Sequence, residues 1–200
     1  MAKYGRGLVC MPMSAKRAQQ LGLTLMVSDK NQNQSQSRSD LGTQFTNSIE
    51  AAVGVTTGIS AADRACTIKA AVAKDATACD INQPGHIFPI IAQDGGVLTR
   101  AGHTESACDY AQLAGFEPAG AIVEILNEDG TMARKDDLFK IAKEHNIKIG
   151  TVADLIKYRM QNEKTLECVH NSQVQTRYGD FTLNIFNDLV GDQTHCVLQK

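Results

Sequence analysis

The segment AGAIVEILN, residues 119–127, is the most strand-like part of the chain, because its side chains are almost all apolar. A nearly continuous apolar run of this length is typical of a β-strand that is covered on both faces. The NEDG that ends it, residues 127–130, supplies the polar and glycine residues of a turn. The pattern predicts a buried strand, and the charged Glu124 inside it needs a reason.

Helices are expected where helix-favouring residues follow a capping residue. The helix in SAKRAQQLGL is predicted to begin after Ser14 and to end near Gly22, which can adopt the left-handed conformation. The Ala-rich stretch AADRACTIKAAVAK, residues 61–74, is predicted to form a second helix. Its first turn contains Asp63, where a negative charge is favourable.

Two more helices are predicted beyond the apolar strand. KDDLFKIAKEHN, residues 135–146, repeats apolar residues at helical spacing, with Asp136 as a possible cap. In TVADLIKYR, residues 151–159, Thr151 and Asp154 have the spacing of a capping box.

Further strands are expected on either side of the Ala-rich helix. FTNSIEAAVGVTTGIS, residues 45–60, has a strand followed by a glycine-rich turn, and HIFPIIAQ, residues 86–93, follows a loop over residues 75–85. Because strands and helices alternate, we predict the α/β (α+β) class. The expected architecture is a mixed sheet covered by helices in three layers, α-β-α.

The segment from Ser28 to Gly42 is polar apart from Leu41, so it cannot become ordered by burying apolar surface. We predict a surface loop here. A loop of this length is either an inert linker or a lid over a neighbouring site, and both interpretations stay open.

The character of the chain changes beyond Arg159. MQNEKTLE, residues 160–167, is predicted to be a polar linker, and residues 167–186 contain two short strands around a Tyr-Gly-Asp turn. We therefore predict a main domain over residues 1–159. Residues 160–200 are expected to contain the linker and a segment that is too short to fold alone.

Composition favours small-molecule chemistry. The chain has 200 residues, of which 42% are hydrophobic, and a formal net charge of −2 with no basic run, which argues against nucleic acid or an anionic membrane surface as partner. No apolar run is long enough to span a membrane and the N-terminus lacks a secretory signal, so a cytoplasmic location is expected. The six cysteines form no C-x-x-C pair and are predicted to be buried, reduced thiols.

The stretch LTRAGHTES combines features of an anion-binding loop. Gly102 lets the backbone approach an anion, Arg100 offers a fork of donors, and Thr104 is predicted to cap a helix that begins there. His103 lies beside this loop, where a neutral imidazole could hold a divalent cation. The alternative is a structural histidine before a helix.

Two other residues are candidates for proton transfer. Glu124 in its apolar strand must find a partner or have a raised pKa, which suits a general acid or base, although a structural salt bridge is the alternative. His86 follows a Pro-Gly turn at the start of a strand, where a residue can point into a cleft or simply be solvated.

The motifs PGHIFP, RAGHTE and NEDGTMAR occur together in the part of the chain from Gly5 to Arg159. With their surroundings they closely resemble the 3,4-dihydroxy-2-butanone 4-phosphate synthases of riboflavin biosynthesis. The resemblance implies a lyase that converts D-ribulose 5-phosphate into L-3,4-dihydroxy-2-butanone 4-phosphate and formate. It also implies Mg²⁺ or Mn²⁺ as cofactor and a homodimer with its sites at the subunit interface.

The resemblance assigns roles to residues at matching positions. It implies that His103 is a metal ligand and that Glu124 contacts substrate and shuttles protons. It implies that His86 is needed for catalysis and can serve the neighbouring subunit's site. The residues that match the loop binding the substrate phosphate are Arg100, Ala101, Gly102, His103 and Thr104.

Two features differ from the family pattern. The family begins with an acidic loop of the type ENEGD that provides a second metal anchor; MAKYGRGLVC corresponds to the helix end and strand after it, so the loop is expected upstream of Met1. Residues 169–200 resemble the opening of a GTP cyclohydrolase II domain, as in bifunctional fusions. His103 alone would bind Mg²⁺ weakly, which keeps open a catalytically silent phosphosugar-binding or dimerisation module.

Overall fold

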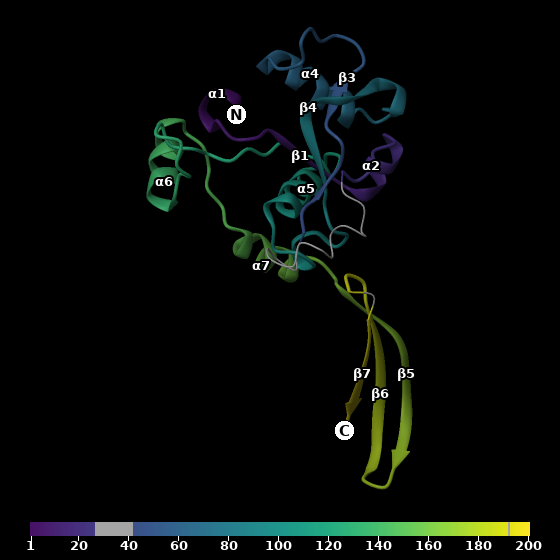
Figure 1. The fold of residues 1–200 in the computed structure, drawn as a ribbon. Helices are drawn as coiled ribbons and strands as arrows, with labels where there is room; N and C mark the ends of the chain where they lie inside the picture. Colours follow the sequence, from purple (N-terminus) through teal and green to yellow (C-terminus); the bar gives the residue numbers. More distant parts are fainter. Residues whose placement is uncertain (27–41, 192) are drawn as a thin grey trace.

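The computed structural model describes residues 1–26, 42–191 and 193–200 (Figure 1). The predicted loop from Ser28 to Gly42 lies outside these ranges except for its last residue, so its role as linker or lid stays a prediction. Among the described residues, no helix is long and apolar enough to cross a membrane.

The main sheet is built around β4, Ile81–Ile91. Strand β1, Cys10–Met13, runs parallel to it, while β2, Gln44–Phe45, and β3, Ile49–Ala51, pair with it in the antiparallel direction. The sheet is therefore mixed, as predicted. All residues of β1 are buried, as expected for a strand covered on both faces.

Strand β4 begins earlier than the sequence pattern predicted. A short 3-10 helix, Ala78–Asp80, occupies part of the predicted loop, and the strand then runs through the Pro-Gly turn that was expected to precede it. Gly85 allows this path, because a Cβ atom there would overlap the backbone of Ile49 in β3. Only glycine fits at so close an approach between two backbones.

The segment 119–126 is not the fully buried strand that was predicted. It lies antiparallel along β1 through isolated bridges, including Cys10 to Ile122 and Met13 to Ala119. Its residues are half-buried, and Glu124 is exposed. An apolar run indicates only that its side chains avoid water, not what covers them. The prediction was wrong because one face of this segment remains open within a single chain. The following turn is confirmed by the bond from the Gly130 amide to the Asn127 carbonyl.

Helices α2, Ala15–Gln20, and α4, Ala61–Val72, form where predicted. The side chain of Ser14 caps α2, and Gly22 takes the left-handed conformation with φ 64°. Both helices pack on one face of the sheet. Their apolar residues join alternate residues of β1 in a core that includes Val9, Met11, Met13, Ala18, Leu21, Ile49, Ala71 and Ile87.

Helix α5, His103–Leu113, packs against β1. Successive residues of a strand point to opposite faces, and none of the α5 residues belongs to the core formed with α2 and α4. Helix α5 therefore covers the second face of the sheet (Figure 1). Helices on both faces confirm the predicted α/β class and layered arrangement.

Helices α6, Lys135–Glu144, and α7, Val152–Asn162, follow in the predicted places. Thr151 caps α7 by accepting from the Asp154 amide. Asp136 is not the cap of α6, because the helix begins two residues earlier than that cap requires: its N-cap is Arg134, whose amide donates to Oδ2 of Asp137 in the first turn.

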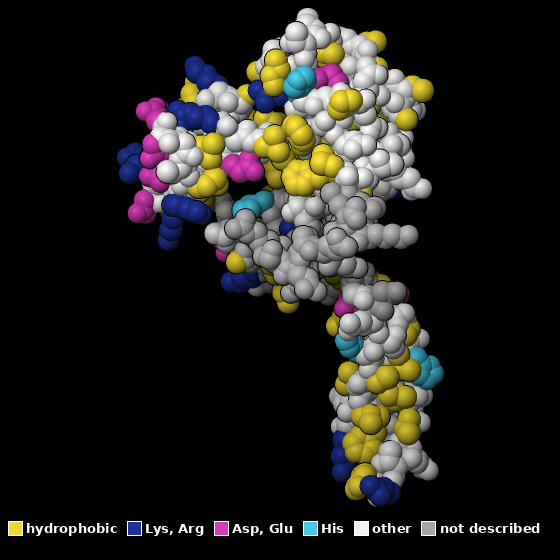
Figure 2. Space-filling model, viewed as in Figure 1, with side chains coloured by type: hydrophobic (Ala, Val, Ile, Leu, Met, Phe, Trp, Pro, Cys, Tyr) yellow, Lys and Arg dark blue, Asp and Glu magenta, His cyan; other side chains and the backbone are white. Residues whose placement is uncertain are grey.

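The C-terminal residues form a separate antiparallel sheet that projects away from the main body (Figure 1). It consists of β5, Leu166–Thr176, β6, Gly179–Asp188, and β7, Thr194–Gln199. The hairpin of β5 and β6 was predicted, but its strands are longer than expected and β7 was missed. Hydrophobic side chains follow this sheet along its surface (Figure 2).

Candidate functional site

The loop between β4 and α5 holds the predicted anion-binding residues. It contains a 3-10 turn, Gly96–Leu98, preceded by Gly95, and both Gly95 and Gly96 have positive φ values of 85° and 63°. A side chain at Gly96 would overlap the carboxylate of Asp109. The glycines therefore let the loop fold tightly onto helix α5.

Helix α5 starts two residues earlier than predicted, at His103. Its N-cap is Gly102, which has no side chain to cap the helix, and Thr104 is buried in the first turn. The expected capping role of Thr104 is therefore wrong. The first backbone N–H groups of an α-helix have no acceptor within the helix, so the amides after Gly102 remain available to bind an anion.

Arg100 is held in place by the first turn of the same helix. Its Nη1 atom lies 2.7 Å from Oε2 of Glu105, whose side chain is only 1% exposed. The other oxygen, Oε1, accepts from the backbone amide of Gln93 at 3.0 Å. A Cβ atom at Gly102 would overlap the ends of both side chains, so glycine leaves room for this ion pair. The guanidinium is thus fixed beside the helix N-terminus.

His103 and Ala101 are exposed on either side of Gly102. The imidazole therefore lies at the rim of the loop, where the sequence placed it. Within the described ranges, no group of three or more His, Cys, Asp or Glu side chains is arranged to hold a metal ion. His103 is a suitable nitrogen ligand, but these residues do not form a complete metal site.

Glu124 lies on a different element but close to β1. Its backbone carbonyl accepts from the Gly7 amide at 3.2 Å, and a Cβ atom at Gly7 would come within 2.6 Å of its Oε2 atom. Glu124 is exposed, so the expectation that its carboxylate is enclosed in an apolar strand was wrong.

The thiol of Cys10 lies in the neighbourhood of the Glu124 carboxylate. Burial, together with the negative charge of Glu124, raises the pKa of Cys10 to about 11. The thiol therefore stays protonated at neutral pH. Cys10 is almost fully buried, which favours a packing role for it.

His86 forms a pair that sequence analysis did not anticipate. Its Nδ1 atom lies 2.6 Å from Oε2 of Glu50 in β3. The other oxygen of Glu50 accepts from the hydroxyl of Thr67 in α4 at 2.8 Å. The histidine is therefore oriented by a carboxylate that is itself held by a helix.

Asp109 and Arg159 also hold the loop between β4 and α5 in place, a role that sequence analysis did not predict. Asp109 accepts from the Val97 amide and from Arg159, each at 2.9 Å, and Arg159 also donates to the Gly95 carbonyl at 2.9 Å. The only sequence signal was a pair of charges far apart in the chain, which gives no indication that they meet.

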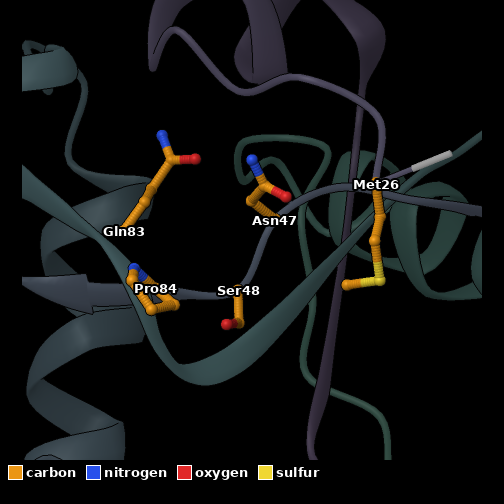
Figure 3. A pocket seen from close by; sticks show the side chains of 5 residues that line it. All are labelled: Met26, Asn47, Ser48, Gln83 and Pro84. Atoms are coloured by element: carbon orange, nitrogen blue, oxygen red, sulfur yellow. The ribbon is translucent and has the colours of Figure 1, made fainter. Parts of the chain in front are cut away.

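A cavity of about 360 Å³ opens near the start of β4. Figure 3 shows its lining, formed by Met26, Asn47, Ser48, Gln83 and Pro84. The Ser48 hydroxyl accepts a hydrogen bond from the Gly85 amide at 3.1 Å, which fixes this wall of the cavity. Gly85 immediately precedes His86 in the sequence. None of the residues predicted for the site lines this cavity.

The fold and the loop define a class of protein: an α/β protein whose loop between β4 and α5 places an arginine beside a helix N-terminus, an arrangement that suits a small anionic ligand. Comparison with known proteins narrows this class. The chain belongs to the 3,4-dihydroxy-2-butanone 4-phosphate synthase family, whose sequence model matches residues 1–158.

Curated relatives carry the same description. A 3,4-dihydroxy-2-butanone 4-phosphate synthase of Pseudomonas aeruginosa is 54% identical over 99% of this chain and 52% of its own length. One from Klebsiella pneumoniae is 49% identical over 81% of this chain and 71% of its own length. A riboflavin biosynthesis protein RibBA of Endomicrobium trichonymphae is 45% identical over 100% of this chain and 48% of its own length. The chain thus spans about half the length of several curated relatives it matches.

Solved structures agree with the fold. RibBX of A. baumannii, described as a two-domain 3,4-dihydroxy-2-butanone 4-phosphate synthase, superposes with a TM-score of 0.86 at 50% identity, over 100% of this chain and 57% of that chain. A synthase in complex with two magnesium ions gives a TM-score of 0.70 at 33% identity, over 82% of this chain and 78% of that chain.

Proposed function

We propose that this protein is a lyase of riboflavin biosynthesis that converts D-ribulose 5-phosphate into L-3,4-dihydroxy-2-butanone 4-phosphate and formate. The observation that carries the proposal is the fixed Arg100 beside the N-terminus of α5, since the 2.7 Å pair with Glu105 arranges a cation and free amides around one point. Membership in the synthase family supplies the reaction.

In this proposal the loop from Arg100 to Thr104 binds the substrate phosphate. A phosphate group is favoured at a helix N-terminus because backbone N–H groups and the helix dipole act together. Arg100 adds charge-assisted hydrogen bonds and fixes the orientation of the ester. The sugar carbons then lie beside exposed His103.

His86 and Glu124 are proposed to exchange protons with the substrate. Cys10 pairs with Phe88 in β4 and with Ile122 on its other side. This register shifts before it reaches Glu124, because Arg6 bridges Ile125 and the Gly7 amide donates to the Glu124 carbonyl at 3.2 Å. The proposal that both side chains act on one substrate rests on their positions in the family's motifs, with His86 able to serve the site of a neighbouring subunit.

The proposed reaction needs proton transfer at adjacent carbons of the sugar. A base removes a proton next to the carbonyl to form an enediol, after which water is lost and the carbon skeleton migrates; a water molecule then adds back and one carbon leaves as formate. An exposed carboxylate such as Glu124 and a neutral imidazole such as His86 are suited to take up and return these protons.

A divalent cation, Mg²⁺ or Mn²⁺, is proposed as cofactor, with His103 as one ligand. Bound to the sugar oxygens, it would acidify the neighbouring C–H bond. A relative with two magnesium ions supports this choice. His103 on its own is a weak site for a hard cation, so the proposal requires further oxygen ligands.

We further propose a cytoplasmic homodimer with its sites at the subunit interface. The half-buried apolar segment 119–126 supports this, because a second subunit could cover its open face. Residues 160–200 are proposed to be the linker and the start of a second domain resembling GTP cyclohydrolase II. Relatives named RibBA support that continuation.

The test is formate release from ribulose 5-phosphate with Mg²⁺ or Mn²⁺, measured by a coupled formate dehydrogenase assay. Turnover that disappears with a chelator and returns with added metal supports the lyase. Substrate binding by calorimetry without any formate would overturn the proposal and favour a silent phosphosugar-binding module. The His103→Ala variant is the matched control, because it is expected to lose the metal response while it stays folded.

A further inference from the structure

The pairing of Glu50 with His86 has the geometry of an oriented catalytic base. The distance of 2.6 Å between Oε2 and Nδ1 is that of a short, charge-assisted hydrogen bond. The Glu50 side chain is 13% exposed and the His86 side chain 43% exposed. The carboxylate is thus largely enclosed, whereas the ring is open to an incoming molecule.

The Glu50 carboxylate has few ways to move. Its Oε1 atom accepts from the Thr67 hydroxyl, and Thr67 in turn accepts from the Ala51 amide at 3.0 Å. Thr67 is fully buried in α4. A carboxylate already anchored through Oε1 loses little further freedom when the ring binds Oε2, so the pair is preorganised.

Gly58 closes the other side of the pair. It has a positive φ of 81°, and a Cβ atom there would overlap Oε2 of Glu50 and come within 2.7 Å of Nδ1 of His86. Its amide donates to Oδ2 of Asp63 at 3.1 Å, which fixes the turn. Strand β3, helix α4 and the turn at Gly58 therefore all hold the hydrogen bond between Glu50 and His86 in place.

The bond selects a tautomer of the ring. An ionised carboxylate can only accept, so Nδ1 of a neutral His86 must carry the proton and Nε2 is left with a lone pair. Within the described chain, Nε2 makes no hydrogen bond. A surface ion pair would have both partners exposed and no such support.

We propose that Glu50 is a positioning residue for the reaction, which holds neutral His86 as the Nδ1–H tautomer and presents Nε2 to the substrate as proton acceptor. The inference rests on the proposed function, in which His86 exchanges a proton with the sugar. Glu50 itself does not touch the substrate; it acts through His86.

The first measurement reads the ring directly and needs no activity. The ¹⁵N chemical shifts of the His86 ring are recorded in the 200-residue chain, with the signal assigned by its loss in His86→Gln. Wild type is expected to show the Nδ1–H form, and Glu50→Ala is expected to shift it to the Nε2–H form. Wild-type protein in the Nε2–H form would overturn the proposal.

The second measurement is kinetic. Glu50→Gln is expected to lower kcat roughly 100-fold with little change in KM, because a general base contributes about 10²–10⁴-fold and needs the correct tautomer. In a His86→Ala background, adding Glu50→Gln is expected to cost nothing more, since both changes remove one function. Independent, multiplying losses would mean a structural role for Glu50 and would overturn the proposal.

The control is Asp80→Asn, which removes a carboxylate just before the same strand. Asp80 caps its own turn through the Thr77 amide at 2.8 Å and has no contact with His86. It is expected to leave kcat and the ring tautomer unchanged. If the wild-type protein releases no formate, the proposed function is wrong. The tautomer measurement would still decide whether Glu50 orients His86.

Discussion

Arg159 and Asp109 form an ion pair at 2.9 Å that joins helix α7 to helix α5. Both side chains are largely buried, with 14% and 7% exposure. The same carboxylate holds the Val97 amide, and the same guanidinium holds the Gly95 carbonyl. The pair thus ties the end of the main domain to the loop that precedes the proposed phosphate site.

Replacing Arg159 by Met is expected to lower the free energy of unfolding by about 2–4 kcal/mol, because Asp109 would be left buried without its partner charge. Chemical denaturation followed by circular dichroism measures the change. Lys140→Met is the matched control, since the Lys140 side chain is 79% exposed and its Nζ atom lies 3.9 Å from Oδ1 of Asp137. Equal small losses in both variants would show that the pair contributes no more than a surface contact.

The part of the fold that sequence analysis predicted depends on local signals. The capping residues Ser14 and Thr151 fix helix starts through bonds within a few residues, and both predictions were confirmed. The apolar run around Glu124 was misjudged, because burial of a segment depends on what packs against it and not on its own sequence.

The contacts that support the candidate site could not be predicted from the sequence, for a related reason. The motif containing Arg100 and His103 is contiguous, so its chemistry is visible in one stretch. Glu50 and His86 are 36 positions apart and meet only because β3 pairs with β4 across an irregular register. A single sequence carries no signal for such a long-range pairing.

Arg100→Lys is expected to raise KM for ribulose 5-phosphate roughly 10- to 100-fold with a smaller effect on kcat. Lysine keeps the charge but lacks the planar fork that both the Glu105 carboxylate and a phosphate can engage. Steady-state kinetics of formate release checks this. Arg177→Lys is the control, because Arg177 stacks on Tyr178 in the C-terminal sheet, away from the loop. An unchanged KM in Arg100→Lys would exclude Arg100 from phosphate binding.

Cys10 and Cys108 are expected to resist alkylation. Burial raises the pKa of Cys10 to about 11 and that of Cys108 to about 12, so almost no reactive thiolate exists at pH 8 in either case. Cys79 is exposed and serves as the internal control. Mass spectrometry after iodoacetamide treatment of the native protein should find Cys79 modified first. Labelling of Cys10 at the rate of Cys79 would contradict the buried environment.

Acid stability should depend on the hydrogen bond between Thr56 and Asp63. The Thr56 hydroxyl donates to Oδ2 of Asp63 at 2.8 Å, and this bond is the main cause that lowers the pKa of Asp63. A carboxyl with a lowered pKa in the folded state stabilises the protein above its ordinary pKa, and that contribution is lost as the pH falls through the lowered value.

Thr56→Val removes the bond, so Asp63 would be protonated at a higher pH during acidification. The midpoint of acid unfolding, followed by circular dichroism, is therefore expected to move to higher pH than in wild type. Thr194→Val is the control, since Thr194 makes only a 3.3 Å contact with Asn187 in the C-terminal sheet and contacts no carboxylate there. A midpoint that stays the same in Thr56→Val, or shifts equally in both variants, would mean that Asp63 does not govern acid stability.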